Sequence, residues 1–457
     1  MSSDTLKLNP FEKRTAISLS LVFALRMLGL FMIMPIFAIY GQSLIGYSPL
    51  WVGLAIGAYG LTQAALQIPA GMLSDKVGRR PVIYGGLVLF AIGSLVAAFS
   101  DSVYGVTIGR ALQGTGAIAS AILALAADVT REQQRPKVMG MIGVSIGLAF
   151  AIAMMAGPIL APFIGLQGLF LITAAGAILG IIIVHTTIPN VVNKAPKSDT
   201  VANPSMMLNL AKHPQLLRLN TGIFILHLTL SAIFVILPLS LQSMHFNAEQ
   251  HWKIYFPALL ISFVLIIPML ISAAKKQRNK HFYLASILLM SLSLIIMSVL
   301  QQSIILMFFA ILLFFTAFNF LEASLPAFVS MLTPAGSKGT AMGIYSTHQF
   351  LGAFFGGIVG GLSYKLVGSS GLFLSLAGIM IIWFLLSLGM NNPSKIKTFT
   401  FTTKIKNQQH SDTIISQLVA LKGALEVVVI AEEQIVYIKA NTLTFQQHEA
   451  KHILDDS

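Results

Sequence analysis

Residues 71–80 read GMLSDKVGRR, a short polar stretch with one aspartate and three basic residues. It joins two apolar runs, residues 49–70 and 81–99, and each run is long enough to cross a lipid bilayer as a helix. The whole chain shares this character, because 56% of its 457 residues are hydrophobic and only 10% are charged. Soluble domains carry about 25% charged residues. The composition therefore predicts an integral membrane protein with short polar joints.

Apolar runs of this length recur along the chain. A helix needs roughly 20 apolar residues to cross the hydrocarbon core. Runs that reach or approach this length cover residues 16–40, 49–72, 81–99, 104–127, 137–163, 168–188, 218–243, 252–274, 281–299, 303–332, 340–363 and 370–390. We therefore predict an α-helical membrane protein with twelve transmembrane helices.

Lysine and arginine are concentrated in every second joint. One set of joints, which includes the N-terminal tail, carries nearly all of the lysines and arginines that lie in joints, for example Lys76, Arg131 and Lys275. The other set carries only Lys253 and Lys365. Because basic joints are retained on the cytoplasmic side, the sequence predicts that both termini are cytoplasmic.

The second half of the chain resembles the first at an offset of 203 residues. The run Gly168–Leu171 (GLFL) returns as Gly371–Leu374, and Gly165 matches Gly368. This alignment pairs the fifth span with the eleventh and the sixth with the twelfth. The repeat is thus six helices long, and the two halves have the same orientation in the membrane. Such parallel repeats match one known transporter architecture, whose substrate path lies between the halves.

The repeat and the change of composition after the last span divide the chain into four parts. Residues 1–188 and 218–392 are predicted to form the two six-helix halves, and 189–217 a cytoplasmic linker. Within the linker, residues 205–213 (SMMLNLAKH) predict a short amphipathic helix. Residues 397–457 are predicted to form a soluble cytoplasmic domain.

The opening stretch lies between the second and third of these spans. Its residues Gly71, Asp75, Gly78, Arg79 and Arg80 have a spacing that resembles the signature loop of the major facilitator superfamily. The resemblance extends over about residues 10–392. It is to the drug:proton antiporters of that family, and it implies a bacterial inner-membrane transporter.

Two further stretches resemble motifs of the same family. Arg110 and Gln113 in the fourth span resemble the fourth-helix motif, and Gly157-Pro158 in the fifth span resembles the antiporter motif. The second match is incomplete, because Ala153 and Ala161 stand where that motif has glycines. Small residues still permit close helix packing, but the departure leaves symport open beside antiport.

Asp75 adds nothing to retention of the positive joints, since that signal depends on lysine and arginine. An anion can instead favour the positive N-terminal end of a helix, and the eleventh span begins on the same side near Gly339. Arg79 can pair with Asp128 at the end of the fourth span. The resemblance implies a conformational latch that holds the cytoplasmic sides of the halves together. We assign to it Gly71, Asp75, Gly78, Arg79, Arg80, Asp128 and Gly339; the alternative is that the arginines only fix topology.

Several ionisable residues lie inside the spans, where a central charge costs about 2.5–3.5 kcal/mol. Glu322 is the only acid well inside a span, and we predict that it carries the coupled proton, with His348 and His227 as partners. Packing through a neutral ring is the alternative for both histidines. We assign Arg26, Arg110, Gln113 and Asn319 to the substrate cavity; structural bonding is the alternative for the two arginines.

The tail differs in pattern from the spans. Residues 398–406 alternate as a strand does, 412–422 and 445–454 read as helices, and 426–431 and 435–440 as strands. This βαββα order predicts a small ferredoxin-like domain. Because the chain has no cysteine, a thiolate metal site is excluded, and we read His410, His448 and His452 as surface residues. We expect the tail to bind a regulator or to self-associate.

The functional expectation is a secondary active transporter that works by alternating access. Proton-coupled efflux of small drug-like or amphipathic molecules is the first hypothesis. Proton-coupled uptake of a polar metabolite, and a membrane sensor with the tail as output domain, are the alternatives. A phosphate-binding loop of the GxxxxGK[ST] type is absent from the sequence, which argues against ATP as the energy source. We expect no enzymatic activity, no cofactor, no metal and no nucleic acid as partner; the expected partners are the substrate, protons and the bilayer.

Overall fold

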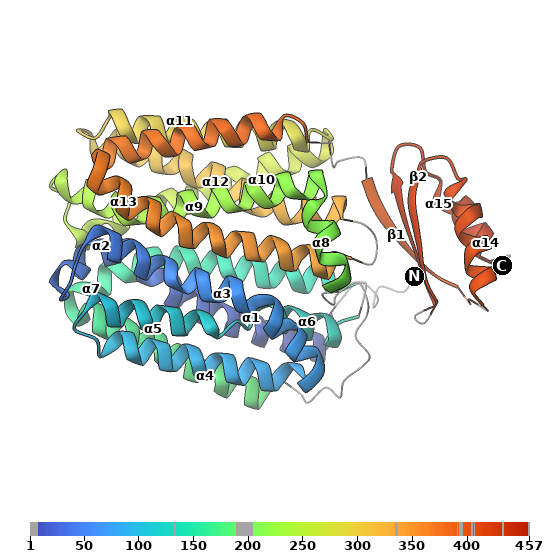
Figure 1. Cartoon of the computed structure of the whole chain (residues 1–457), viewed down its shortest axis with the longest axis horizontal. Coiled ribbons are helices and arrows are strands. Elements are labelled where there is room, and N and C mark those ends of the chain that lie inside the picture. Colours follow the sequence, from blue (N-terminus) through green and yellow to red (C-terminus); the bar gives the residue numbers. More distant parts are fainter. Residues whose placement is uncertain are drawn as a thin grey trace.

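The computed structural model describes residues 8–131, 134–188, 204–333, 337–390, 392, 396–403, 405, 407–431 and 434–455. The first part of the predicted linker, residues 189–203, and residues 432–433 of the tail lie outside the described residues. The described residues form a helical bundle with a small α+β domain at one end (Figure 1).

The first half follows the predicted apolar runs. Its helices are α1 (Pro10–Met32), α2 (Met34–Tyr40), α3 (Pro49–Val77), α4 (Arg79–Ala98), α5 (Val103–Thr115), α6 (Ala119–Val129) and α7 (Arg135–Thr187). Side-chain caps mark several helix starts. Ser48 accepts a hydrogen bond from the backbone N–H of Trp51, and Ser102 accepts one from that of Gly105. Such caps satisfy N–H groups that have no partner in the first helical turn.

Two predicted spans are not single helices. The first is divided between α1 and α2 at Ile33, because Pro35 has no N–H with which to continue the helix. The fourth is divided between α5 and α6, and Gly116 there has a non-helical backbone. A Cβ at Gly116 would lie 2.2 Å from the carbonyl oxygen of Gly86. The break therefore coincides with a close approach of two backbones that only glycine allows.

The second half is built in the same way. Its helices are α8 (Pro204–Lys212), α9 (Pro214–Ser243), α10 (Trp252–Lys275), α11 (Asn279–Val299), α12 (Ile304–Leu332) and α13 (Lys338–Ser387). The short α8 occupies the place of the predicted amphipathic helix. It lies across the end of the bundle nearest the small domain (Figure 1).

The helices α7 and α13 each cross the bundle twice. They contain 53 and 50 residues, which would span about 75–80 Å if straight. Each is broken by one glycine with positive φ, Gly165 (62°) in α7 and Gly368 (68°) in α13. The described residues hold ten helices that are long and apolar enough to span a membrane, and these two breaks raise the number of spans to twelve. The two glycines are the pair that the sequence repeat aligned.

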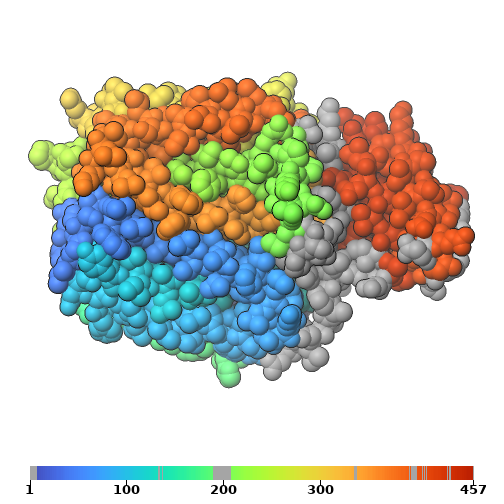
Figure 2. Space-filling model, in the orientation of Figure 1, coloured from blue at the N-terminus to red at the C-terminus, as the bar shows by residue number. Residues whose placement is uncertain are grey.

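Helices α3 and α13 form the closest contact between the halves. They run antiparallel, and their backbones meet at glycines: a Cβ at Gly53 would lie 1.9 Å from the carbonyl oxygen of Gly357. A Cβ at Gly60 would lie 2.5 Å from the carbonyl oxygen of Phe350, and a Cβ at Gly361 would lie 2.4 Å from the carbonyl oxygen of Pro49. On the face shown in Figure 2, the blue N-terminal half abuts the orange C-terminal half along this contact, which we call the glycine seam.

The basic joints gather at one end of the bundle, which we call the basic end; it carries Lys76, Arg79, Lys275 and Lys338. Hydrogen bonds tie the joints together there. Arg131 donates to Glu12 at the start of α1, at 2.8 Å, and Lys280 donates to the carbonyl of Leu388 at 2.7 Å. At the other end, α2 packs on both α7 and α9 and so contacts both halves.

The small domain has the element order that the sequence predicted. It consists of β1 (Ile396–Thr402), α14 (Gln408–Val419), β2 (Ala424–Ile430), β3 (Ile435–Asn441) and α15 (Gln447–Asp455). The three strands that the described residues form are antiparallel in the order β1-β3-β2. Val436 and Ile438 of β3 pack with Ile414 and Leu418 of α14 in the core of the domain. The helices therefore cover one face of the sheet.

The other face of the sheet is turned toward the bundle (Figure 1). Its β3 residues Ile435, Tyr437 and Lys439 are only 6%, 5% and 8% exposed. Lys439 Nζ donates to the carbonyls of Leu332 and Thr333 at the end of α12, at 2.9 and 3.1 Å. The last carbonyls of a helix have no partner within it, so Lys439 caps α12 from the tail.

Replacing Lys439 with methionine, which keeps the stem and removes the donors, is expected to release the tail from α12. Hydrogen bonds of a charged group contribute about 1.5–3 kcal/mol, so the undocked fraction should rise at least about tenfold. Thr333 is fully buried beside Lys439, and a cysteine there, in a chain without native cysteine, reports undocking by its reaction with a thiol reagent. Lys422→Met, at an exposed lysine, is the control. Equal labelling of the two variants would contradict the capping role.

Docking is also expected to depend on pH. Burial lowers the pKa of Lys439 below the usual lysine value. The docked tail therefore binds this proton less tightly than the free tail does. Docking should strengthen as pH rises from the lowered pKa toward the usual one and should be weakest below that range. The Thr333→Cys reaction, corrected for the intrinsic pH dependence of the thiol, measures this trend.

Candidate functional site

Arg79 joins three helices at the basic end. Its guanidinium bonds the carboxylate of Asp75 on α3, and its Nε lies 3.1 Å from Asp128 Oδ2 on α6. It also donates to Ser74 Oγ at 2.7 Å. The predicted pairing of Arg79 with Asp128 is thus present. All of these groups belong to the first half, and the further contact of Asp75 with the start of α13 at Gly339 stays a prediction.

The other residues assigned to the latch lie around this cluster. Gly78 has φ of 100° and ends α3, so it makes the turn into α4 that a side chain would strain. Arg80 points elsewhere, with Nη2 donating to Tyr84 and to the carbonyl of Val184. Gly71 faces Ser120, and a Cβ on it would lie 3.2 Å from the hydroxyl. The structure therefore brings together Asp75, Arg79 and Asp128 and leaves Arg80 outside that cluster.

Asp75→Asn is expected to move the protein toward the state that is open at the basic end. Neutralising an anion near a helix N-terminus costs about 0.3–2 kcal/mol, which is up to about a thirtyfold change in the population ratio. Cysteines introduced at helix ends of the basic end should react faster with a thiol reagent. Asp101→Asn, at an exposed aspartate of the opposite end, is the control. Labelling equal to that of the control would rule out the latch.

Arg26 is buried in the centre of the first half, with 1% of its surface exposed. Its Nη2 donates to Gln63 Oε1 and to the carbonyl of Gly116, both at 2.8 Å. That carbonyl belongs to the break between α5 and α6. The rings of Tyr59 and Phe90 flank the guanidinium, with centroids 5.7 and 5.5 Å away. Arg26 thus makes structural bonds at the break in the fourth span, and its place in the substrate cavity stays a prediction.

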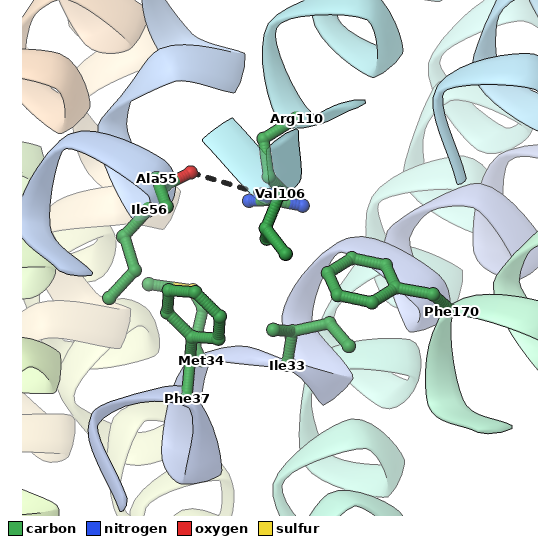
Figure 3. A pocket seen from close by; sticks show the side chains of 8 residues that line it. All are labelled: Ile33, Met34, Phe37, Ala55, Ile56, Val106, Arg110 and Phe170. Carbon is green, nitrogen blue, oxygen red and sulfur yellow. Dashed lines mark hydrogen bonds between the residues drawn. The ribbon is translucent and has the colours of Figure 1, made fainter. Parts of the chain in front are cut away.

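Arg110 is bonded in the same half. It donates to Gln113 Oε1 at 2.9 Å and to the carbonyl of Ala55 at 3.3 Å, and Gln113 donates to Ser94 at 2.8 Å. Figure 3 shows the apolar recess that Arg110 adjoins, lined also by Ile33, Met34, Phe37, Ile56, Val106 and Phe170. All of the residues that line it come from the first half. Arg110 thus makes structural hydrogen bonds of the kind given as its alternative role, and a role for either residue in substrate binding stays a prediction.

Glu322, His227 and Gln349 form a polar cluster between α12, α9 and α13. Gln349 Nε2 donates to Glu322 Oε1 at 3.1 Å and lies 2.9 Å from His227 Nε2. His227 Nε2 and Glu322 Oε2 are 3.8 Å apart. The Glu322 side chain is 38% exposed although it lies in the interior of a spanning helix, whereas His227 is 15% exposed. The Glu322 side chain is thus partly exposed, whereas its Oε2 atom is itself buried and has no hydrogen-bond partner among the described residues.

The two other residues predicted near Glu322 bond elsewhere. Asn319 donates to Ser262 of α10 at 2.8 Å, so it joins α12 to α10. His348 lies beside Gln349 on α13, and its Nδ1 is 2.8 Å from the carbonyl of Ile344 in its own helix. Neither contact tests the proposed roles in the cavity and in proton coupling.

Gly157-Pro158 lies where α7 meets the junction of α1 and α2. A Cβ at Gly157 would stand 2.3 Å from the carbonyl oxygen of Met32 and 3.3 Å from Pro35. The close packing expected of this motif is therefore present. It lies within the first half and does not distinguish antiport from symport.

Sequence reasoning missed Gln349, Gln63 and Tyr59. These side chains are uncharged, so the free-energy cost of placing them inside a membrane span is too small to mark them as functional in the sequence. Tyr59 nevertheless lies between the guanidinium groups of Arg26 and Arg110, with its ring centroid 5.7 and 5.4 Å from them. Gln349 had one usable signal: it directly follows His348 in the polar run STHQ of an otherwise apolar span.

Comparisons with known proteins agree with this architecture. The family model of the Major Facilitator Superfamily matches residues 19–278 and 273–431. The chain is 40% identical over 448 residues to the inner membrane transport protein YajR of Escherichia coli strain K12, and the match covers 98% of each chain.

Solved structures show the same fold. A bacterial homologue of the human lysosomal transporter Spinster, described as inward-facing and unoccupied, superposes with a TM-score of 0.68 at 14% identity, covering 84% of this chain and 98% of that one. The human organic anion transporter MFSD10 gives a TM-score of 0.63 at 20% identity, covering 83% and 100%.

Proposed function

The chain belongs to the major facilitator superfamily and is a multi-pass inner membrane transport protein by that relationship; from this premise we propose that it exports small drug-like or amphipathic molecules in exchange for protons. Export proceeds by alternating access, with the substrate path between the halves 1–188 and 218–392. The observation that carries the proposal is the carboxyl group of Glu322, an acid in the interior of a spanning helix that contacts His227 and Gln349.

The basic end faces the cytoplasm in this proposal. Lysine- and arginine-rich joints are retained on the cytoplasmic side of a membrane, which supports this orientation. In this orientation, both termini and the tail lie in the cytoplasm. At the opposite end, α2 packs against both halves and the glycine seam reaches Pro49 and Gly361. The present conformation is accordingly closed toward the outside.

The register of the glycine seam supports the latch. Gly361 meets Pro49, Gly357 meets Gly53, and Gly343 meets Ile68. If the same antiparallel spacing continued, Gly71 would lie level with Gly339, and Asp75 would lie near the start of α13. An anion in that place would favour the helix N-terminus, as the sequence suggested.

Proton coupling requires a group whose proton affinity differs between the inward-open and the outward-open state. A bound proton can shift the balance between these states only if its affinity for them differs. The charge of a carboxyl group is disfavoured by an apolar environment and favoured by water. When the cavity opens to one side or the other, the hydration of Glu322 changes. Glu322 therefore binds its proton on one side and releases it on the other.

Aromatic rings next to the cluster support an apolar or amphipathic substrate. Phe318 lies 5.9 Å from the His227 ring, and Phe314 stacks on Phe318 at 6.1 Å. Phe315 contacts Phe150 of the other half at 6.0 Å. Phe314, Phe315 and Phe318 are only 1%, 1% and 5% exposed in the present conformation, so their faces would offer apolar contact area to a flat molecule once the helices around them part.

The tail is proposed to be a ferredoxin-like domain without the last strand. The order β1-β3-β2, with helices on one face, supports this assignment. Its contact with α12 through Lys439 gives it a route to the transport cycle. Binding of a regulator to the tail, or its self-association, would act by that route.

Purified protein in vesicles with an imposed pH gradient tests the function. Efflux coupling predicts that a fluorescent amphipathic cation such as ethidium moves against the direction of proton flow. Movement with the protons would support uptake instead. Absence of flux for every compound tried, with either sign of gradient, would favour the sensor alternative. Empty vesicles and vesicles with the Glu322→Gln variant are the controls.

A further inference from the structure

The side-chain amide of Gln349 bridges Glu322 and His227. Its Nε2 lies 3.1 Å from Glu322 Oε1 and 2.9 Å from His227 Nε2. An ionised carboxylate only accepts hydrogen bonds, so the amide must turn its NH₂ group toward Glu322. The same NH₂ group then meets His227. With Glu322 ionised, His227 Nε2 then accepts as well, which assigns the proton of a neutral ring to Nδ1, a buried atom with no hydrogen-bond partner among the described residues.

While Glu322 is ionised, this geometry opposes a proton on His227 Nε2. An N–H there would point at the N–H of Gln349 without an acceptor. Rotating the amide would offer its oxygen to His227, but it would also turn that oxygen toward the carboxylate, where two acceptors would face each other. A proton on Glu322 meets no such conflict, because the carbonyl oxygen of a neutral acid still accepts from Gln349.

The surroundings supply no other ionised partner for His227 among the described residues. Around the cluster, α13 contributes Tyr345 and His348, and α11 contributes Tyr283 beside Tyr345. The residue of α10 that contacts α12 at Asn319 is Ser262, which is uncharged. Glu322 and His227 are therefore the two groups between which the bonding of Gln349 decides the place of the proton.

Gln349 also lies next to the glycine seam. The following residue, Phe350, has its carbonyl oxygen against Gly60 and its ring 6.3 Å from that of Tyr59. A change in the bonding of Gln349 is thus one residue away from the closest contact between the halves.

We propose that Gln349 is a positioning residue that keeps His227 neutral as an acceptor and so directs the coupled proton to Glu322. This inference rests on the proposed function only for its effect on flux; the tautomer and charge of His227 can be observed without transport. Thus a failure of proton coupling and a failure of this proposal give different results.

Nitrogen NMR of ¹⁵N-histidine-labelled protein in nanodiscs tests the proposal directly. The His227 signals are identified by their loss in His227→Asn. We expect the ring of the wild type to remain neutral, with the proton on Nδ1, across the pH range in which the other histidines titrate. In Gln349→Leu, His227 should become protonated at a pH at least about one unit higher than in the wild type, because the opposing N–H is gone and Glu322 becomes its partner.

Thr347→Val is the matched control, because its hydroxyl bonds only within α13, to the carbonyl of Gly343 at 3.0 Å. Gln349→Asn, with a shorter amide, should give an intermediate result. A His227 titration in Gln349→Leu that coincides with the wild type would overturn the proposal. So would a wild-type His227 that carries its proton on Nε2.

Flux gives the second readout. Loss of the Gln349 donor should move the midpoint of pH-driven flux to higher pH by about one to two units. It should also split the profile into two steps, since two interacting groups then titrate. The double variant His227→Asn/Gln349→Leu should return to one step. If the pH profile of flux had the same midpoint and the same shape in Gln349→Leu and in the double variant, Gln349 would act on Glu322 alone. That result would contradict the proposal that Gln349 bridges Glu322 and His227.

Discussion

Glu322→Gln is expected to abolish transport driven by a pH gradient while substrate exchange across the membrane continues. Glutamine keeps the size of the side chain and can still bond Gln349, but it cannot take up or release a proton. If residue 322 cannot bind a proton, its proton affinity cannot differ between the two transport states. A pH gradient then cannot drive the substrate uphill. The loss of uphill accumulation should be complete.

Measurement of both processes in one preparation separates coupling from folding. Accumulation is followed in vesicles with an imposed pH gradient, and exchange is followed with labelled substrate on one side and unlabelled substrate on the other. Glu249→Gln, at an exposed acid of the opposite end of the bundle, is the matched control and should behave as wild type. If Glu322→Gln still accumulates substrate in response to pH, another residue carries the proton, and His348 becomes the first alternative.

Gly53→Ala is expected to have the second large effect, because it adds a Cβ where there is no room. That Cβ would lie 1.9 Å from the carbonyl oxygen of Gly357 and 2.7 Å from its carbon. Both atoms are backbone, so no side-chain rotation relieves the clash and the helices α3 and α13 must separate. Overpacking of this kind costs about 1–3 kcal/mol, which corresponds to a change of about five- to 150-fold in the balance between states.

The alanine should open the end opposite to the basic end. Cysteines introduced near Pro49 and Gly361 are expected to react faster with a membrane-impermeant thiol reagent, and uphill transport should fall. Gly378→Ala, on α13 itself with nothing within 4 Å of an added Cβ, is the control. If Gly53→Ala had the labelling rate and transport of the control, then α3 and α13 would accommodate the added Cβ without a change in the balance between states, and the prediction would be wrong.

The sequence was most informative where a single strong energy term decides the structure. The preference of apolar side chains for lipid was enough to predict the ends of most spans to within a few residues. For example, the predicted span 303–332 corresponds to α12 (Ile304–Leu332). The joint glycines 165 and 368 were found because the repeat aligned them, and both adopt a left-handed backbone. In the tail, alternation of apolar residues was enough to give the order of strands and helices.

The sequence was least informative where several weak terms combine. Arg26 was singled out because the cost of burying its charge can be recognised in the sequence. The carbonyl of Gly116 that it bonds was not visible, because the break in the fourth span was predicted as continuous helix. The glycine seam did have a signal: Gly53 and Gly57 are four residues apart, as are Gly352 and Gly356, a spacing that permits close helix approach. Spacing alone does not identify the partner helix.

The capping of α12 by Lys439 has a thermodynamic consequence. Leu332 is ten residues beyond Glu322 on the same helix, about 15 Å away, so the tail grips the far end of the element that holds the proton. If the grip differs between the two transport states, then any molecule that binds the docked tail changes the proton affinity of Glu322. Reciprocity requires that proton binding change the affinity for that molecule by the same factor. The affinity of the tail for such a molecule would then report the pH to which Glu322 is exposed.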